Sequence, residues 1–297
     1  MPNWRLAANK QMSKGTKVVE DDLEEQGEAE IGELPSRVET LIQRLYRDPR
    51  YLLVGKVERF GRELIAFVEG CTILSATGEV RGQALLDGEY EMRGRPDGER
   101  PHGEESLLEY YLSARSGGRP PLGEEELAEL REESWQYYVR RNFSFLLKDF
   151  ERAREDAEHN LGIWNLVDQS QASDADKWAY LKWWPWIERD RAVAQALWDL
   201  QQGDPEHAAT ELYRAQRSIE QFGDKHAAQY AQEEPQGRSL CDHMSQHIAT
   251  LVELLREDEK LPVSLEERLD QATARGDMGE VERLRGEMIR RATEEGV

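Results

Sequence analysis

The C-terminal stretch at 264–292 constrains the fold more than any other part of this chain. Its apolar residues are spaced by three or four positions on either side of one turn: Leu265, Leu269, Ala272, Val281, Leu284 and Met288. This spacing predicts two short amphipathic helices. Gly276 can adopt positive φ and end the first helix, while Asp277 can cap the second. Because helices this short are unstable alone, their stripes must pack together and then against a third surface.

Local signals mark where this hairpin begins. Pro262 ends the preceding segment, and Ser264 with Glu267 three residues later forms a capping box. We therefore expect the hairpin to be a docking element. Its expected contact residues are Leu265, Leu269, Ala272, Val281, Leu284, Arg285 and Met288.

The same hairpin resembles the UVR motif, which occurs in excinuclease subunits B and C and in adaptors of bacterial Clp-type proteases. The matching positions are Leu269, Ala272, the turn up to Met278, Glu280, Leu284, Arg285 and Met288. Val281, Glu282 and Gly286 depart from the family pattern. The resemblance implies contact with another protein rather than catalysis.

The charge balance of the whole chain restricts its partners. Acidic residues outnumber basic ones, 60 to 39, which gives a formal charge of −21. A phosphate backbone would be repelled, so we expect no direct binding of nucleic acid. We also expect no membrane contact, because no apolar run approaches the roughly 20 residues of a membrane span. The two cysteines, Cys71 and Cys241, lack metal or secretory spacing, and no signal peptide is visible, which favours the cytoplasm.

The first third of the chain divides into a tail and a small module. Residues 1–33 contain an acidic run at 20–25 and are expected to be a disordered acidic tail. Residues 34–115 are expected to form a β-rich module with flanking helices at 36–45 and 104–114. Extended runs at 51–57 and 63–68 predict a β-hairpin. Three further short strands are expected at 71–76, 79–86 and 89–93, each following one of the glycines Gly70, Gly78 and Gly88.

A turn-rich loop follows the predicted sheet. It mixes charged residues and a histidine before a helix N-terminus, where free amides can bind an anion. The candidate ligand residues are Arg95, Asp97, Arg100 and His102. The alternative is that proline and glycine simply fix the path from sheet to helix. The run GRPDGERPHGEESLLEYY is similar to one in uncharacterised bacterial proteins that end in a UVR motif, a resemblance that implies no activity.

Residues 124–257 are expected to form antiparallel helical pairs, with helices at 124–147, 150–167, 175–202, 205–222 and 238–256. Ala196, Ala208 and Ala215, with Leu212 between them, fall where tetratricopeptide repeats (TPRs) place small residues, so these pairs resemble TPR hairpins. The predicted fold class is mainly α: TPR-like antiparallel helical hairpins with a small N-terminal antiparallel β module and a C-terminal UVR-like helical hairpin.

Two clusters in this region are candidates for a partner-binding site and for a metal site. Trp183, Trp184 and Trp186 cannot all face one way on a helix, so at least one should be exposed to a partner. His243 and His247 share a helix face, as metal ligands would, but Cys241 lies about 200° away around the helix. We therefore expect no metal, no cofactor and no catalytic residue, since no phosphate loop or nucleophile motif is present.

These patterns favour a non-enzymatic adaptor or scaffold in the cytoplasm. It would dock another protein, or a second copy of itself, through the C-terminal hairpin and the helical-repeat face. The alternative hypothesis is a protein or enzyme that binds a small anionic ligand through the loop at 95–102.

Overall fold

The computed structural model describes residues 34–48, 50–59, 61–74, 80–115, 122–233, 240–258 and 260–294, with the backbone alone for 52, 70–74, 80–87, 115, 233, 292 and 294. The predicted acidic tail lies outside these residues, as does most of the loop before residue 124. The described chain is predominantly helical, with a small antiparallel sheet near its N-terminal end, which confirms the predicted class. No described helix has both the length and the apolar character needed to cross a membrane.

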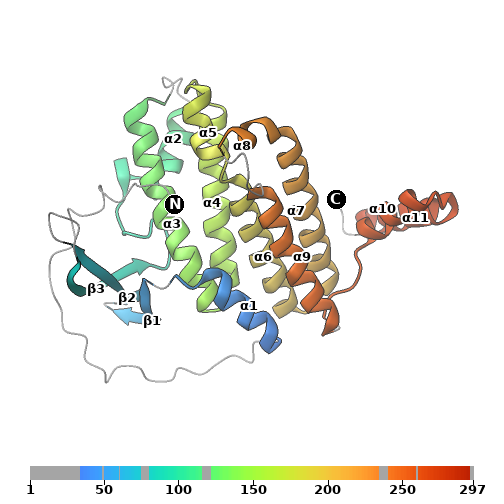
Figure 1. Ribbon diagram of the computed structural model, residues 1–297, viewed down its shortest axis with the longest axis horizontal. Coiled ribbons are helices and arrows are strands. Elements are labelled where there is room, and N and C mark those ends of the chain that lie inside the picture. Colours follow the sequence, from blue (N-terminus) through green and yellow to red (C-terminus); the bar gives the residue numbers. More distant parts are fainter. Residues whose placement is uncertain are drawn as a thin grey trace.

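The helices form an antiparallel bundle with a separate pair at the C-terminal end (Figure 1). Their bounds are Ser36–Tyr46 (α1), Leu107–Arg115 (α2), Glu124–Leu146 (α3), Phe150–Asp168 (α4), Asp174–Leu181 (α5), Trp184–Gln202 (α6), Pro205–Lys225 (α7), Ala227–Glu233 (α8), Leu240–Glu257 (α9), Leu265–Arg275 (α10) and Met278–Glu294 (α11). The main apolar core lies between α1, α3, α4, α6, α7 and α9. A second cluster joins α2 to α3, α4 and α5.

The helix expected at 175–202 is in fact two helices, α5 and α6, which is a correction to the prediction. Pro185 lies in the first turn of α6 rather than at a kink inside one long helix. Proline is well suited to this position, because its missing N–H would have no helical acceptor there. The break turns the chain between Leu181 and Trp184 and separates the aromatic residues onto different faces.

The sheet has the strand order β1-β2-β3, with strands Tyr51–Arg59, Arg62–Leu74 and Val80–Glu91. The first hairpin was predicted correctly, and Gly61 adopts φ 70° in its turn. The short strands expected beyond it are instead two long ones, because β2 runs through Gly70 and β3 through Gly88. Ile65, Phe67 and Met92 pack against Val139 and Phe143 of α3, so the sheet is attached to the bundle through one helix.

Gly88 remains inside its strand because it lies under an aromatic ring. It is the cross-strand partner of Phe67, and a Cβ atom at Gly88 would stand 2.3 Å from Phe67 Cζ. We expect Gly88→Ala to lower the free energy of unfolding by about 1–3 kcal/mol, since the buried ring must move. Urea denaturation measures this, with Gly55→Ala as the control because nothing lies within 4 Å of its Cβ position. Equal losses in the two variants would contradict the packing argument.

Candidate functional site

The C-terminal hairpin is built by the caps expected of it. Ser264 Oγ accepts a hydrogen bond from the Glu267 amide at 3.2 Å, and Asp277 Oδ1 accepts one from the Glu280 amide at 3.1 Å. Gly276 ends α10 with φ 71°. These contacts fix a tight turn between α10 and α11, so the pair is locally determined.

The apolar stripes of the hairpin close on each other. Leu265, Ala272, Val281 and Leu284 are buried between α10 and α11, and Leu269 and Met288 pack against them partly buried. Six of the seven residues expected to contact a partner therefore form the hairpin's own core. Arg285 is the exception and lies exposed on the outside.

Polar contacts attach the hairpin to the bundle. Tyr213 donates a hydrogen bond to Asp270 at 2.6 Å, Arg214 pairs with Glu266 at 2.6 Å, and Arg291 lies 3.5 Å from Glu206. Arg256 of α9 also pairs with Glu267. A groove of about 340 Å³ remains between the two parts, lined by Tyr213, Gln216, Arg217, Val252 and Gln271 among others. The hairpin thus projects from the bundle with one side toward it and one side outward (Figure 1).

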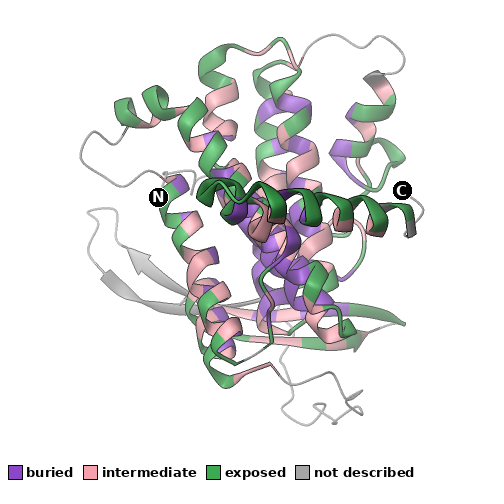
Figure 2. Ribbon diagram, turned by 90° about the vertical axis from the view of Figure 1, so that its right-hand side faces the viewer, coloured by how far each residue is buried: buried purple, intermediate pink, exposed green. Residues whose placement is uncertain are grey.

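The outward side of α11 carries large apolar side chains. Met278 is 61% exposed and Ile289 is 69% exposed. With Glu282 and Arg285 they fall at i, i+4, i+7 and i+11, so they share one helix face. Figure 2 shows this side of the hairpin exposed, with the buried residues gathered in the helices behind it.

Two arginines beside this face have no counter-charge in the described chain. Arg283 and Arg291 pair with Glu287, whereas Arg285 and Arg290 make no ion pair with any described residue. Gly286 between them has nothing within 4 Å of its Cβ position, so another backbone can approach closely there. We call Met278, Glu282, Arg285 and Ile289, with Gly286 and Arg290 beside them, the α11 outer face. It combines exposed apolar side chains with two arginines and one glutamate.

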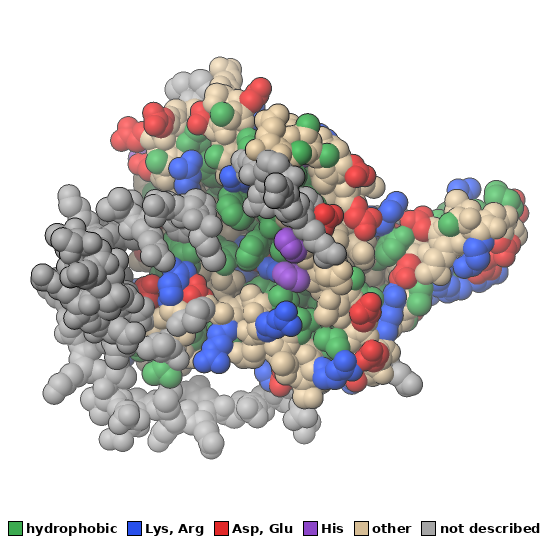
Figure 3. Space-filling model, in the orientation of Figure 1, with side chains coloured by type: hydrophobic (Ala, Val, Ile, Leu, Met, Phe, Trp, Pro, Cys, Tyr) green, Lys and Arg blue, Asp and Glu red, His purple; other side chains and the backbone are tan. Residues whose placement is uncertain are grey.

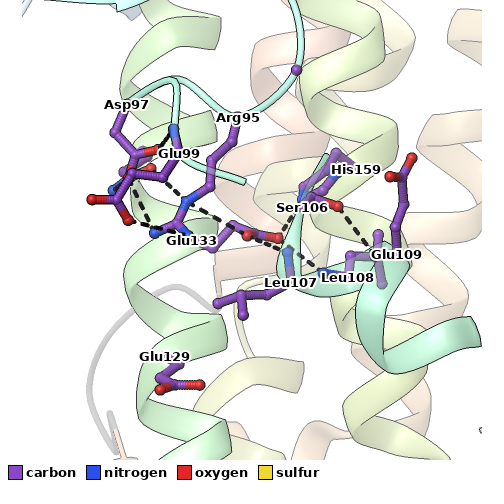
Figure 4. A network of polar contacts seen from close by, with 12 residues as sticks. Arg95, Asp97, Glu99, Ser106, Leu107, Leu108, Glu109, Glu129, Glu133 and His159 are labelled. Atoms are coloured by element: carbon purple, nitrogen blue, oxygen red, sulfur yellow. Dashed lines mark hydrogen bonds and ion pairs between the residues drawn. The ribbon is translucent and has the colours of Figure 1, made fainter. Parts of the chain in front are cut away.

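The charged side chains of the loop at 95–102 pair with one another and with residues of α3. Arg95 lies 3.1 Å from Asp97 and 3.8 Å from the buried Glu133, and Asp97 also accepts a hydrogen bond from Gln136 at 2.9 Å (Figure 4). Arg100 is exposed, and its nearest acidic partner is Glu105 at 3.9 Å. His102 stacks on Tyr110 with ring centroids 3.8 Å apart.

The cavity beside this loop does not concentrate positive charge. Its volume is about 200 Å³, and its charged lining is mixed: Arg62, Glu91, Arg93, Arg95, Glu99, Arg100 and Glu105. Of the four predicted ligand residues, Arg95 and Arg100 line this cavity, whereas Asp97 and His102 do not. The arrangement is that of a loop held by its own ion pairs.

The tryptophan cluster is divided by the break before α6. Trp184 stacks on Phe222 at 4.8 Å, and Trp186 lies under the Arg189 guanidinium at 5.1 Å. Trp183 is exposed, so one of the three is accessible, as the spacing predicted. The other two, Trp184 and Trp186, pack against the apolar core.

The residues weighed as metal ligands point to different places. Cys241 is buried against Gly223 of α7, while His243 is exposed. Burial raises the pKa of the Cys241 thiol to about 11, so it stays protonated at neutral pH. Among the described residues, no group of three His, Cys, Asp or Glu side chains could hold a metal ion.

Sequence reasoning missed two buried charge networks. In one, Glu133 of α3 accepts hydrogen bonds from the amides of Leu107 and Leu108 at 2.7 and 3.1 Å, and His159 Nε2 lies 2.9 Å from it (Figure 4). In the other, Asp190 of α6 contacts Tyr46, Arg141 and Arg189. A charged residue between apolar neighbours is a weak signal in a chain that is 33% charged.

Comparison of the chain with models of protein families, with curated proteins and with solved structures gives no match. The function is therefore argued from the geometry of the α11 outer face and of the buried networks.

Proposed function

We propose that this protein is a non-enzymatic cytoplasmic adaptor that docks a partner protein through the α11 outer face. The observation that carries the proposal is the pair Met278 and Ile289, both exposed on a hairpin that already has a complete core of its own. Exposed large apolar side chains on one face of a projecting helix are typical of a helix-docking surface. The resemblance to the UVR motif, whose relatives make protein contacts, supports the same proposal.

Charge favours one kind of partner. Arg285 and Arg290 flank the apolar residues and have no acidic partner in the described chain. An amphipathic helix with an apolar stripe and an acidic border would complement both features. A second copy of this chain is the competing occupant, because a two-fold contact pairs residue i of one copy with residue j of the other and can bring Glu282 to Arg285.

The geometry of the loop at 95–102 gives less support to the alternative hypothesis, in which the protein binds a small anionic ligand. An anionic ligand would compete with Asp97 and Glu133 for Arg95, which lies among acidic side chains. Arg100, the other predicted contact, is exposed and lies 3.9 Å from the acidic side chain of Glu105. The loop is better explained as a support for the junction of sheet and bundle.

The test is a substitution in the centre of the face. We expect Ile289→Glu to reduce recovery of the partner at least about tenfold, because loss of a central apolar anchor costs 2 kcal/mol or more. The full chain and the variant serve as baits in a lysate of the source cells, read by mass spectrometry. Leu53→Glu is the matched control, since Leu53 is also 69% exposed but lies on the sheet.

A partner that binds both variants equally would overturn the proposal. Self-association is distinguished by the mass of the purified protein in solution. If wild type is a dimer and Ile289→Glu is a monomer, the face binds a second copy rather than a different protein.

A further inference from the structure

The core around Asp190 contains more positive than negative charge. Arg141 Nη2 lies 2.8 Å from Asp190 Oδ2, Arg189 Nε donates to Asp190 Oδ1 at 2.9 Å, and all three side chains are almost completely buried. Tyr46 of α1 donates a further hydrogen bond to the same carboxylate at 3.0 Å. One carboxylate thus faces two guanidinium groups. Nε and Nη1 of Arg141 have no acceptor in the described chain.

His247 of α9 lies between the buried Arg189 and the surface. Arg189 Nη1 lies 2.9 Å from His247 Nδ1. Since a guanidinium can only donate, His247 Nδ1 must accept, and the ring proton is on Nε2. Burial and then Arg189 lower the pKa of His247 to about 4, so the ring is neutral at pH 7 and still offers its Nε2–H as a donor. No acceptor for Nε2 lies in the described chain.

An arginine and a second histidine lie near His247 at the surface. His243 lies one turn earlier on the same face of α9 and is exposed. Arg37 at the start of α1 pairs with Glu257 at the end of α9, and Tyr46 at the end of α1 contacts Asp190, which bonds Arg189 beside His247. The two helices therefore run antiparallel, and the exposed Arg44 lies toward His247. Both Arg44 and His243 act to lower the pKa of His247, and Asp190 opposes them by raising it. Figure 3 shows the histidines of α9 at the surface with basic side chains nearby.

We infer that the junction of α1 and α9 binds a small oxyanion of the phosphate class, held by Arg44, His243 and the Nε2–H of His247. Arg189 stands directly behind His247, so its charge acts on the bound anion through a low-dielectric core. Local positive charge attracts anions even in a chain of net charge −21. The site is separate from the α11 outer face, and either proposal can fail without the other.

The contrast with the loop at 95–102 shows why the anion belongs here. Arg95 is neutralised by Asp97 and Glu133, so it has no charge to offer. Around His247, the single carboxylate is already shared between Arg141 and Arg189. A dianion satisfies donors arriving from α1 and from two turns of α9, and it compensates the buried excess charge.

The experiment is a titration of the full-length protein with inorganic phosphate in a chloride buffer, followed by nuclear magnetic resonance of the histidine side chains. We expect a saturable shift of the His247 signals. Arg44→Gln is expected to weaken binding about 10-fold or more, as is usual for loss of a charge-assisted hydrogen bond. His247→Gln should weaken binding as well. Arg44 is exposed, so this variant should fold.

Arg100→Gln is the matched control, because its side chain is also exposed but lies in the loop. It should bind phosphate as wild type does. Bound phosphate should also raise the pKa of His247 above about 4, since a nearby anion favours the imidazolium. Absence of a saturable shift, unchanged binding by Arg44→Gln, an unmoved His247 pKa, or loss of binding in Arg100→Gln alone would each overturn the inference.

Discussion

Asp190→Asn is expected to lower the free energy of unfolding by about 3–5 kcal/mol, the loss typical when one partner of a buried ion pair is removed. Asp190 is the carboxylate that Arg141 and Arg189 both contact, and both arginines are buried. Its replacement leaves two guanidinium groups without a counter-charge in a medium of low dielectric. Urea denaturation followed by tryptophan fluorescence measures the loss.

A control and a double variant sharpen this prediction. Asp258→Asn, at an exposed position of the chain just after α9, should change stability by less than about 0.5 kcal/mol. Arg141→Met combined with Asp190→Asn should be more stable than Asp190→Asn alone, because it removes one of the uncompensated charges. If the double variant is instead less stable by the sum of the single losses, the two side chains are not electrostatically coupled.

The Asp190 network shows where prediction from sequence ends. Tyr46 and Asp190 are 144 positions apart, and nothing in either local pattern indicates that they meet. The periods of α1 and α6 mark which faces are apolar, but Arg189 and Asp190 interrupt the face of α6 that is buried. A buried charge is determined by its tertiary neighbours, which no window of sequence contains.

Local chemistry, in contrast, predicted the hairpin well. Ser264, Gly276 and Asp277 act within a few residues of themselves, so their roles could be read directly. The orientation of the stripes could not, because apolar helices in a hairpin can face each other or a partner with the same spacing. In the structure the two apolar stripes pack against each other. The surface that remains for a partner is the one that carries Ile289.

The tryptophan region shows a different limit. Pro185 is compatible with a kink inside a helix and with the first turn of a new one. The choice depends on Trp184, which packs on Phe222 of α7. The same holds for Gly88, where a glycine that looks like a strand end is instead covered by the ring of Phe67.

Glu133→Gln is expected to lower the free energy of unfolding by about 3 kcal/mol at neutral pH, because it leaves buried donors without an acceptor. Glu133 accepts hydrogen bonds from the first two amides of α2, those of Leu107 and Leu108, and it contacts His159 of α4. A glutamine has one oxygen for these donors and turns its own N–H groups toward the others. Hydrogen exchange should show faster exchange at the Leu107 and Leu108 amides than in wild type.

The pH dependence of this loss separates the charge from the shape of the side chain. Burial alone would raise the pKa of Glu133, but the hydrogen bond and charge of His159, with the two amides, lower it below its ordinary 4.5. A carboxylate with a lowered folded pKa stabilises the fold above its unfolded pKa, and this contribution is lost as the pH falls through the folded value. The difference between wild type and Glu133→Gln should therefore be largest at neutral pH and shrink below about pH 4.5.

Glu129→Gln provides the matched control for this pH dependence. Glu129 lies one turn earlier on α3, is exposed, and accepts one hydrogen bond from Tyr111 at 3.2 Å. Its substitution should cost at most about 1 kcal/mol. A difference for Glu133→Gln that stays constant from neutral to acid pH would mean that Glu133 acts through packing. A difference that narrows on acidification, while the amides of α2 exchange faster, would show that the ionised carboxylate holds α2 against α3 and α4.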